Sequence, residues 1–331
     1  MGTKGKVIHI GTISFVLILL FSCSGLKKAK LSSQLEKNNC NHEEIQSYTA
    51  EDLPKPLHSI ALDTVLTNRF SLRSLNISNA VGLLEPLSDY VNLKQSYAAE
   101  PSLEKRIALV ELSQQINQKI NIFSIEISAI AGEMDCEEER ADQIASYLTG
   151  KEAQAESRMT VGAIVVGAVG AISAGILLAN GDDGNTPELI GIGAGLTEAT
   201  LGVLILTNKR KVNFYHKRNA LRDIWSGPTV STIFPPAVWY YLTYTNPSDN
   251  EPSIRQQLVD KWLGFGQIAD TKEKNKTKIY NLFFGKGGKY TANQLTNRAN
   301  MHDQIEAQIN LMSQDLKLLA LEIENLDNDA S

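Results

Sequence analysis

The chain has 331 residues, of which 43% are hydrophobic, and it carries 32 Lys plus Arg against 37 Asp plus Glu. This composition can bury a core, and it excludes both a disordered chain and a small disulfide scaffold. The net charge of −5 argues against a nucleic-acid partner, because neutralising phosphates requires a basic face.

Residues 1–22 are typical of a bacterial export signal. Two lysines precede an apolar run, Val7 to Phe21, which is shorter than the roughly 20 residues that cross a bilayer. The end of this segment, Leu20-Phe21-Ser22-Cys23, resembles the lipobox of bacterial lipoproteins, although Phe21 replaces the small residue usual there. The resemblance implies that Cys23 is the acylated first residue of the mature chain. The alternative is an ordinary secretory signal in which Cys23 is incidental.

Residues 23–56 are expected to form a lipidated tether followed by an irregular segment. Two or three acyl chains on Cys23 would anchor the protein stably, whereas a single chain would not. The residues after it, Ser24 to Lys28, lack the acidic cluster associated with surface export in some bacterial lipoproteins. We therefore expect a lipid-anchored protein of the bacterial cell envelope, at the periplasmic face of the outer membrane, with membrane lipid as a partner.

Two further cysteines, Cys40 and Cys136, remain once Cys23 is acylated. In the oxidising compartment of an exported chain an even pair normally forms a bridge, so we predict a Cys40–Cys136 disulfide. The alternative is a zinc site in which these two cysteines, His42 and a flanking carboxylate bind the metal. No familiar zinc-ligand spacing supports that set, and no metal or other cofactor is expected.

Residues 57–158 are expected to be helical. A first helical stretch between about His58 and Tyr97 should break near Pro86, because Pro disrupts a helix interior.

The second helix of this region is longer. Glu100-Pro101-Ser102 is a favourable start, with Pro in the first turn, and the helix should continue to about Arg158 with Gly150 as a weak point. Its apolar positions recur at steps of mostly three and four, namely Leu103, Ile107, Val110, Ile116, Ile120, Phe123, Ile127, Ile130 and Met134.

Residues 159–208 form a glycine-rich apolar hairpin in this interpretation. Two apolar runs, Val161 to Ala179 and Leu189 to Thr207, are each close to the length that crosses a hydrocarbon core. Small residues recur on each run, at Ala163, Gly167, Ala171 and Gly175 in the first and at Gly191, Gly195 and Ala199 in the second. This pattern resembles the glycine-zipper transmembrane hairpins of several bacterial envelope and pore-forming proteins, which implies that the two sets of small residues face each other.

Two features of the hairpin oppose a simple membrane interpretation. Glu198 lies in the middle of the second run, where a charged carboxylate is costly in lipid. The flanking cations, Arg158 and Lys209 to Lys211, lie on the exported side, against the positive-inside tendency. The alternative is a helical hairpin packed within a soluble bundle.

Residues 209–290 form a basic, aromatic-rich segment with short helices. Its Trp and Tyr residues could lie at the lipid headgroup level, but a buried turn is the commoner arrangement and is favoured here. Residues 253–268 are expected to form a helix with Ile254, Leu258, Trp262 and Phe265 inward. The glycine-rich residues 284–289 lack the order of a phosphate-binding loop and should form a turn.

Residues 291–331 give the clearest periodic signal. Thr291 with Gln294 fits a capping box. Apolar residues then follow at alternating steps of four and three, at Ile305, Ile309, Met312, Leu316, Leu319, Ile323 and Leu326. This repeat predicts a coiled-coil helix whose partner is either a second chain, itself or another envelope protein, or the long helix of the same chain, which is preferred.

Together these patterns predict an all-α protein, an elongated helical bundle with long coiled-coil helices and a glycine-rich apolar hairpin. No catalytic motif appears in the sequence, so the leading hypothesis is a non-enzymatic envelope lipoprotein whose hairpin inserts into or docks onto a membrane. One alternative is a membrane-perforating protein, because the layout resembles that of α-helical pore-forming toxins. The other is a soluble periplasmic scaffold.

Overall fold

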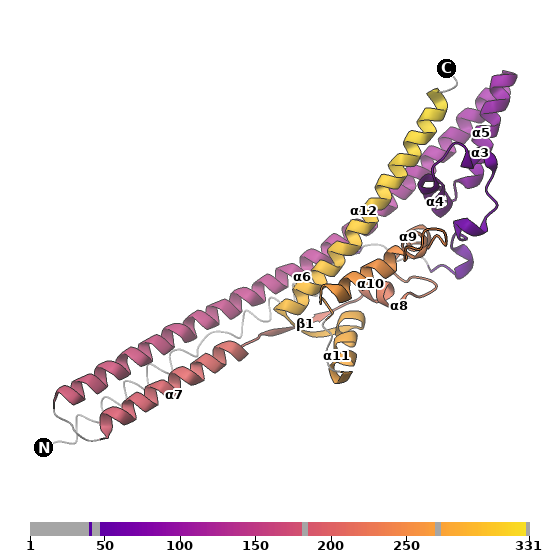
Figure 1. The fold of residues 1–331 in the computed structure, drawn as a ribbon. Coiled ribbons are helices and arrows are strands. Elements are labelled where there is room, and N and C mark those ends of the chain that lie inside the picture. Colours follow the sequence, from indigo (N-terminus) through magenta and orange to yellow (C-terminus); the bar gives the residue numbers. More distant parts are fainter. Residues whose placement is uncertain (1–39, 42–46, 181–184, 269–272, 329–331) are drawn as a thin grey trace. The chain divides into compact units, whose positions relative to one another are not determined.

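The computed structural model describes residues 40–41, 47–180, 185–268 and 273–328 (Figure 1). Residues 43–331 form one unit. Its described part is a helical bundle that also contains one antiparallel two-stranded ribbon. The all-α fold class is therefore confirmed. The predicted signal, Cys23 and His42 lie outside the described residues.

One helix, α6, runs without interruption from Leu103 to Ala179, a length of 77 residues or about 115 Å. Ser102 caps its start by accepting a hydrogen bond from the Lys105 amide, so Pro101 precedes the cap rather than lying in the first turn. Gly150 does not interrupt it, because one glycine costs only about 1 kcal/mol in a helix. The expected boundary between residues 57–158 and 159–208 therefore falls inside a continuous helix.

The last helix, α12 (Ala292–Asn328), packs along the middle of α6. Its start has the predicted capping box, in which the Thr291 amide donates to Gln294 Oε1 and the Gln294 amide donates to Thr291 Oγ1. Six of the seven repeat positions are at most 7% exposed, and Ile323 is half-buried. The preferred intramolecular pairing of the coiled-coil helix is thus observed.

On the side of α6 that packs in the bundle, the buried residues follow the predicted apolar pattern only in the later turns of the helix. Buried positions on α6 begin at Ile116 and include Phe123, Ile127, Ile130 and Met134. The first three predicted positions are instead 51–68% exposed, at Leu103, Ile107 and Val110. The reason is that α5 (Leu84–Ala99) covers a different side of this end of α6.

In the described residues before α6, the chain forms five helical segments. The break predicted near Pro86 lies instead at Gly82, whose φ of 66° favours glycine, while Pro86 is accommodated in the first turn of α5. In this region α4 packs on α12 and α5 packs on α6. The segments are η2 (Ala50–Asp52), η3 (Leu57–Ser59), α3 (Thr64–Thr67), α4 (Leu72–Ala80) and α5.

Between α7 and α12 the chain forms an aromatic core. Phe234 stacks on Trp239 with ring centroids 5.7 Å apart, and both side chains are buried. The favoured buried arrangement of this segment is therefore observed. Phe265 was expected inward but is 70% exposed, because its helix ends at Gly264. The helices are α8 (Ala220–Ser226), α9 (Pro236–Thr243), α10 (Ile254–Gly264) and α11 (Glu273–Phe284).

The ribbon pairs β1 (Lys211–Tyr215) with β2 (Gly287–Thr291) in antiparallel register, Lys211 opposite Thr291. The sequence predicted only a turn at residues 284–289. Gly287 has a φ of 90°, and a side chain there would meet the Phe214 carbonyl, so the glycine permits the close approach of the two strands.

We expect the α6–α12 seam to dominate stability. Ile309 is fully buried, so Ile309→Ala should lower the free energy of unfolding by about 2–5 kcal/mol. Leu311 on the same helix is 41% exposed, and Leu311→Ala should cost far less. Urea unfolding of the two variants measures the difference, and equal losses would contradict the assigned seam.

Candidate functional site

The C-terminal part of α6 and the helix α7 (Thr186–Thr207) form an antiparallel hairpin (Figure 1). They contact each other along a narrow seam, marked by buried and half-buried positions that recur mostly at steps of three and four. On α6 the seam includes Met159, Gly162, Val166, Gly170, Ser173 and Leu177, and on α7 it includes Pro187, Ile190, Ala194, Leu201 and Ile205. Most of these residues are half-buried, and Gly170 and Pro187 are buried.

Two glycines let the helices approach closely. A Cβ atom at Gly170 would lie 2.7 Å from the Cβ of Ala194, nearer than such atoms come in real structures. A side chain at Gly167 would collide with the carboxylate of Glu198. Glu198 therefore extends across the seam and lies against α6 at Gly167, although the residue as a whole remains exposed.

The predicted pairing of the two sets of small residues is not observed. Ala163 and Gly167 lie along the seam, but Ala171 and Ala199 are exposed. The same holds for Gly175, Gly191 and Gly195, where an added Cβ would meet nothing within 4 Å. A step of four residues turns about 40° more than a full helical turn, so four such positions wind out of a nearly straight seam.

The outer faces of the hairpin are apolar and exposed. In the most apolar 18-residue stretch of each helix, the share of buried residues is 6% for α6 and 0% for α7. The core helix of a soluble protein is, by contrast, mostly buried. The large apolar side chains there are 48–79% exposed, at Val161, Ile164, Val165, Val169, Ile172, Ile176, Leu178, Leu189, Ile192, Leu196, Val203, Leu204 and Leu206. If the outer half of each helix is treated as a half-cylinder about 30 Å long, the two together present an apolar surface on the order of 900 Å². This area is larger than the usual exposed apolar patch of a monomeric protein.

The base of the hairpin leads directly into a buried junction of α6, α12 and the ribbon. β1 begins four residues after α7 ends, and His216 follows β1. The Nε2 atom of His216 lies 2.9 Å from the Tyr290 hydroxyl, and its Nδ1 atom is buried with no hydrogen-bond partner in the described part of the chain. The guanidinium of Arg140 from α6 lies 4.4 Å from the centre of the Phe214 ring.

On α12, Arg298 and His302 are 0% and 1% exposed. Arg298 donates to the Phe283 carbonyl at 3.2 Å and to Asn219 Oδ1 at 3.4 Å. Both ring nitrogens of His302 are buried and have no hydrogen-bond partner among the residues that the structure describes. Burial, and then the neighbouring positive charges of Arg298 and Arg140, hold the pKa of His302 well below its usual value. This histidine is therefore neutral in the folded protein.

The same two causes lower the pKa of His216, burial first and Arg298 second. Burial also lowers the pKa of Arg298, whereas Glu137, which pairs with Arg140 at 2.9 Å, opposes that shift. The junction thus combines two buried histidines with two arginines, and additional protons there are unfavourable.

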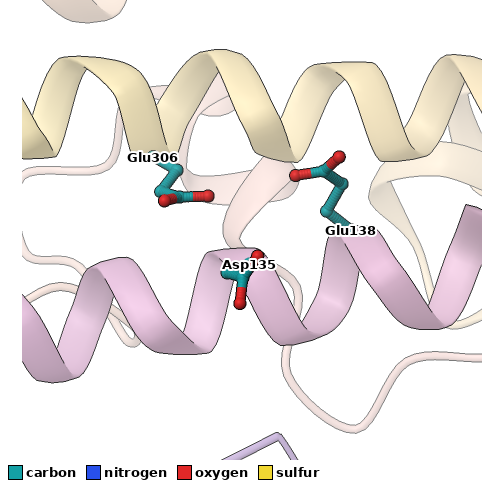
Figure 2. A group of neighbouring side chains, drawn as sticks. All are labelled: Asp135, Glu138 and Glu306. Atoms are coloured by element: carbon teal, nitrogen blue, oxygen red, sulfur yellow. The ribbon is translucent and has the colours of Figure 1, made fainter.

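Carboxylates gather on the α6–α12 seam beside this junction. Figure 2 shows Asp135 and Glu138 of α6 facing Glu306 of α12, and one oxygen of each residue lies within 4.8 Å of the others. Burial and neighbouring carboxylates raise the pKa of Glu138 and of Glu306. Three ligand atoms are fewer than the six or more that Ca²⁺ takes, and Asp135 is exposed, so the cluster does not define a metal centre.

The two described cysteines, Cys40 and Cys136, are both disulfide-bonded, as the predicted disulfide requires. The zinc alternative would need their thiolates as ligands and is therefore not supported.

Sequence reasoning missed the contacts that join distant segments. Gly170 lies outside the four-residue series that drew attention to the other small residues. His216 and His302 are separated by many residues and carry no motif, and the carboxylates meet only because α6 and α12 are antiparallel. Comparison of the chain with family models, curated proteins and solved structures finds no match.

We expect Gly170→Leu to separate the hairpin helices, because the new side chain would meet the Cβ of Ala194, which cannot move without the backbone of α7. Gly195→Leu makes the same change in open space and is the matched control. Amide hydrogen exchange over residues 186–207 should accelerate in the first variant only. Equal exchange in both variants would show that the helices do not meet at Gly170.

We expect acid to destabilise the junction through His302. Its folded-state pKa is depressed, so only the unfolded chain gains a proton as the pH falls below about 6.5, and stability is lost by up to about 1.4 kcal/mol per pH unit. Replacing the ring by His302→Leu should remove this contribution and leave a shallower decline. Urea unfolding at about pH 7.5 and about pH 5.5 measures it.

Two comparisons make this measurement specific. His58→Leu changes an exposed histidine and should leave the pH dependence as in the unmodified chain. The raised pKa values of Glu138 and Glu306 act in the opposite direction, but they are common to every variant and cancel in the comparison. Identical pH dependence with and without His302 would refute the assignment.

Proposed function

We propose that this protein is a non-enzymatic, membrane-associated protein of the bacterial envelope, and that its α6–α7 hairpin inserts into the lipid bilayer. The observation that carries the proposal is the exposure of large apolar side chains around both hairpin helices. In water such a surface is unfavourable at roughly 25 cal/mol per Å². In hydrocarbon the same surface carries no such penalty.

The dimensions of the hairpin support insertion. α7 has 22 residues and is about 33 Å long, which matches a hydrocarbon core of about 30 Å. Both helices satisfy their backbone hydrogen bonds internally, which is the condition for crossing lipid. The seam buries small and medium side chains by close contact, as helices in lipid do.

The contrast with the rest of the unit favours lipid over a soluble scaffold. The middle of α6 is covered by α12, and its apolar stripe there is buried. Beyond residue 158 the same helix packs on α7, and its large apolar side chains there are exposed. A change from covered to uncovered apolar surface along one helix is expected where the helix leaves water.

The lipid anchor proposed at Cys23 would act together with the hairpin. An acylated N-terminus would keep the chain at the membrane, and the hairpin would give it a second, protein-based attachment. The two attachments can be separated experimentally because each depends on different residues. The proposed location remains the periplasmic face of the outer membrane.

The test places charges on the outer face of the hairpin. In a full chain carrying Cys23→Ser, we expect flotation with vesicles to be retained. Adding Ile172→Asp and Leu196→Asp should abolish flotation, because each charge at the centre of a bilayer costs about 2.5 kcal/mol or more. Both original side chains are more than 60% exposed, so the folded body should not change.

The matched control is Ile122→Asp with Ile125→Asp. Both residues lie on α6 outside the hairpin, and they are 60% and 69% exposed. Flotation should persist in this variant, since both positions remain in water. A Cys23→Ser chain that stays monomeric and soluble without vesicles or detergent would overturn the proposal.

A further inference from the structure

We infer that four cations at the base of the hairpin, Arg158, Lys209, Arg210 and Lys211, form a binding surface for anionic lipid headgroups. This basic collar deepens the proposed function, because it presupposes that the hairpin inserts. It adds a preference for one class of lipid.

The collar begins at the depth where headgroups would be and extends below it. Arg158 precedes the apolar run of α6 by three residues, and Lys209 follows the end of α7 by two. The Arg210 amide donates to Glu152 Oε1 at 2.6 Å, which places Arg210 beside α6 about 9 Å below Arg158. Headgroups occupy about 5–8 Å on each side of the core, and long basic side chains extend towards them.

The four side chains are available for a ligand. All four residues are exposed, and within the described part of the chain their side chains form no hydrogen bond or ion pair. Lys151, which directly precedes Glu152 on α6, differs because its ammonium donates to Gln154 at 3.3 Å. The acidic residues nearby on α6, Glu152 and Glu156, do not balance four cations.

The charge of the hairpin is strongly asymmetric. From residue 159 to residue 208 the sequence contains no Lys or Arg, and its charged residues are all acidic. The cations next to the hairpin therefore all lie at its base, although the chain as a whole has a net charge of −5. A concentration of unpaired cations next to an apolar surface matches a bilayer with anionic headgroups, whereas a soluble acidic protein or nucleic acid would complement only the cations.

The experiment compares flotation of the full Cys23→Ser chain with two kinds of vesicle, pure phosphatidylcholine and phosphatidylcholine mixed with phosphatidylglycerol. We expect tighter binding to the anionic vesicles and loss of that advantage in high salt. Arg158→Gln, Lys209→Gln, Arg210→Gln and Lys211→Gln together should weaken anionic binding by roughly 100-fold or more, since each basic residue near such a surface contributes about fivefold. Binding to neutral vesicles should persist.

The control carries the same charge change elsewhere. Lys55, Lys261, Lys278 and Lys317 are exposed residues away from the hairpin, and their replacement by Gln should preserve the preference for anionic vesicles. An equal loss in this control would show that net charge alone is responsible and would overturn the collar. Equal binding of the unmodified chain to both vesicles would overturn the collar but leave insertion standing. Absence of binding to either vesicle would overturn both proposals.

Discussion

The continuity of α6 is the constraint on which the other elements depend. An unbroken helix of 77 residues presents successive parts of its surface to α5, α12 and α7. Because α12 holds the middle of this helix through fully buried positions such as Ile305 and Ile309, the direction of the first hairpin helix is set by the seam of the body. α7 packs on α6, and the pairing of β1 with β2 brings the end of α7 beside the start of α12.

Two unfavourable features lie at opposite ends of the short connection β1. Before it, α7 exposes apolar side chains such as Leu206, which is 79% exposed. After it, the junction buries Arg298 and His302 with unsatisfied nitrogen atoms. Natural proteins concentrate such features where function requires them. A bilayer would remove the first cost, whereas the second makes the attachment of the ribbon to α6 and α12 the acid-sensitive part of the body.

The repeat of α12 could be predicted from sequence because a strict alternation of four and three places Ile305 to Leu326 on one face of any helix. The extent of α6 could not, since Gly150 is a weak local signal and the stabilising contacts come from distant residues. The ribbon was not predicted because Gly287 and Gly288 are typical of a turn. Their strand partner, which includes Phe214, is distant in the sequence. Likewise, the small-residue series included Gly167 but not Gly170. Contact positions between two packed helices recur every 3.5 residues on average, whereas the series was defined by a constant step of four.

Glu198 was the strongest sequence argument against lipid, and its position in the structure changes the weight of that argument. A carboxylate directed outward from α7, at the place of Leu196 for example, would lie in hydrocarbon. Glu198 instead reaches across the seam to the space beside Gly167. There the neighbouring surface is the polypeptide of α6, and the absence of a side chain on Gly167 makes room for the polar group. Glu198 is itself exposed, but its contact with α6 at Gly167 removes part of the carboxylate surface from lipid. An added Cβ at Gly175, Gly191 or Gly195 would meet nothing within 4 Å, so those glycines have no comparable neighbour.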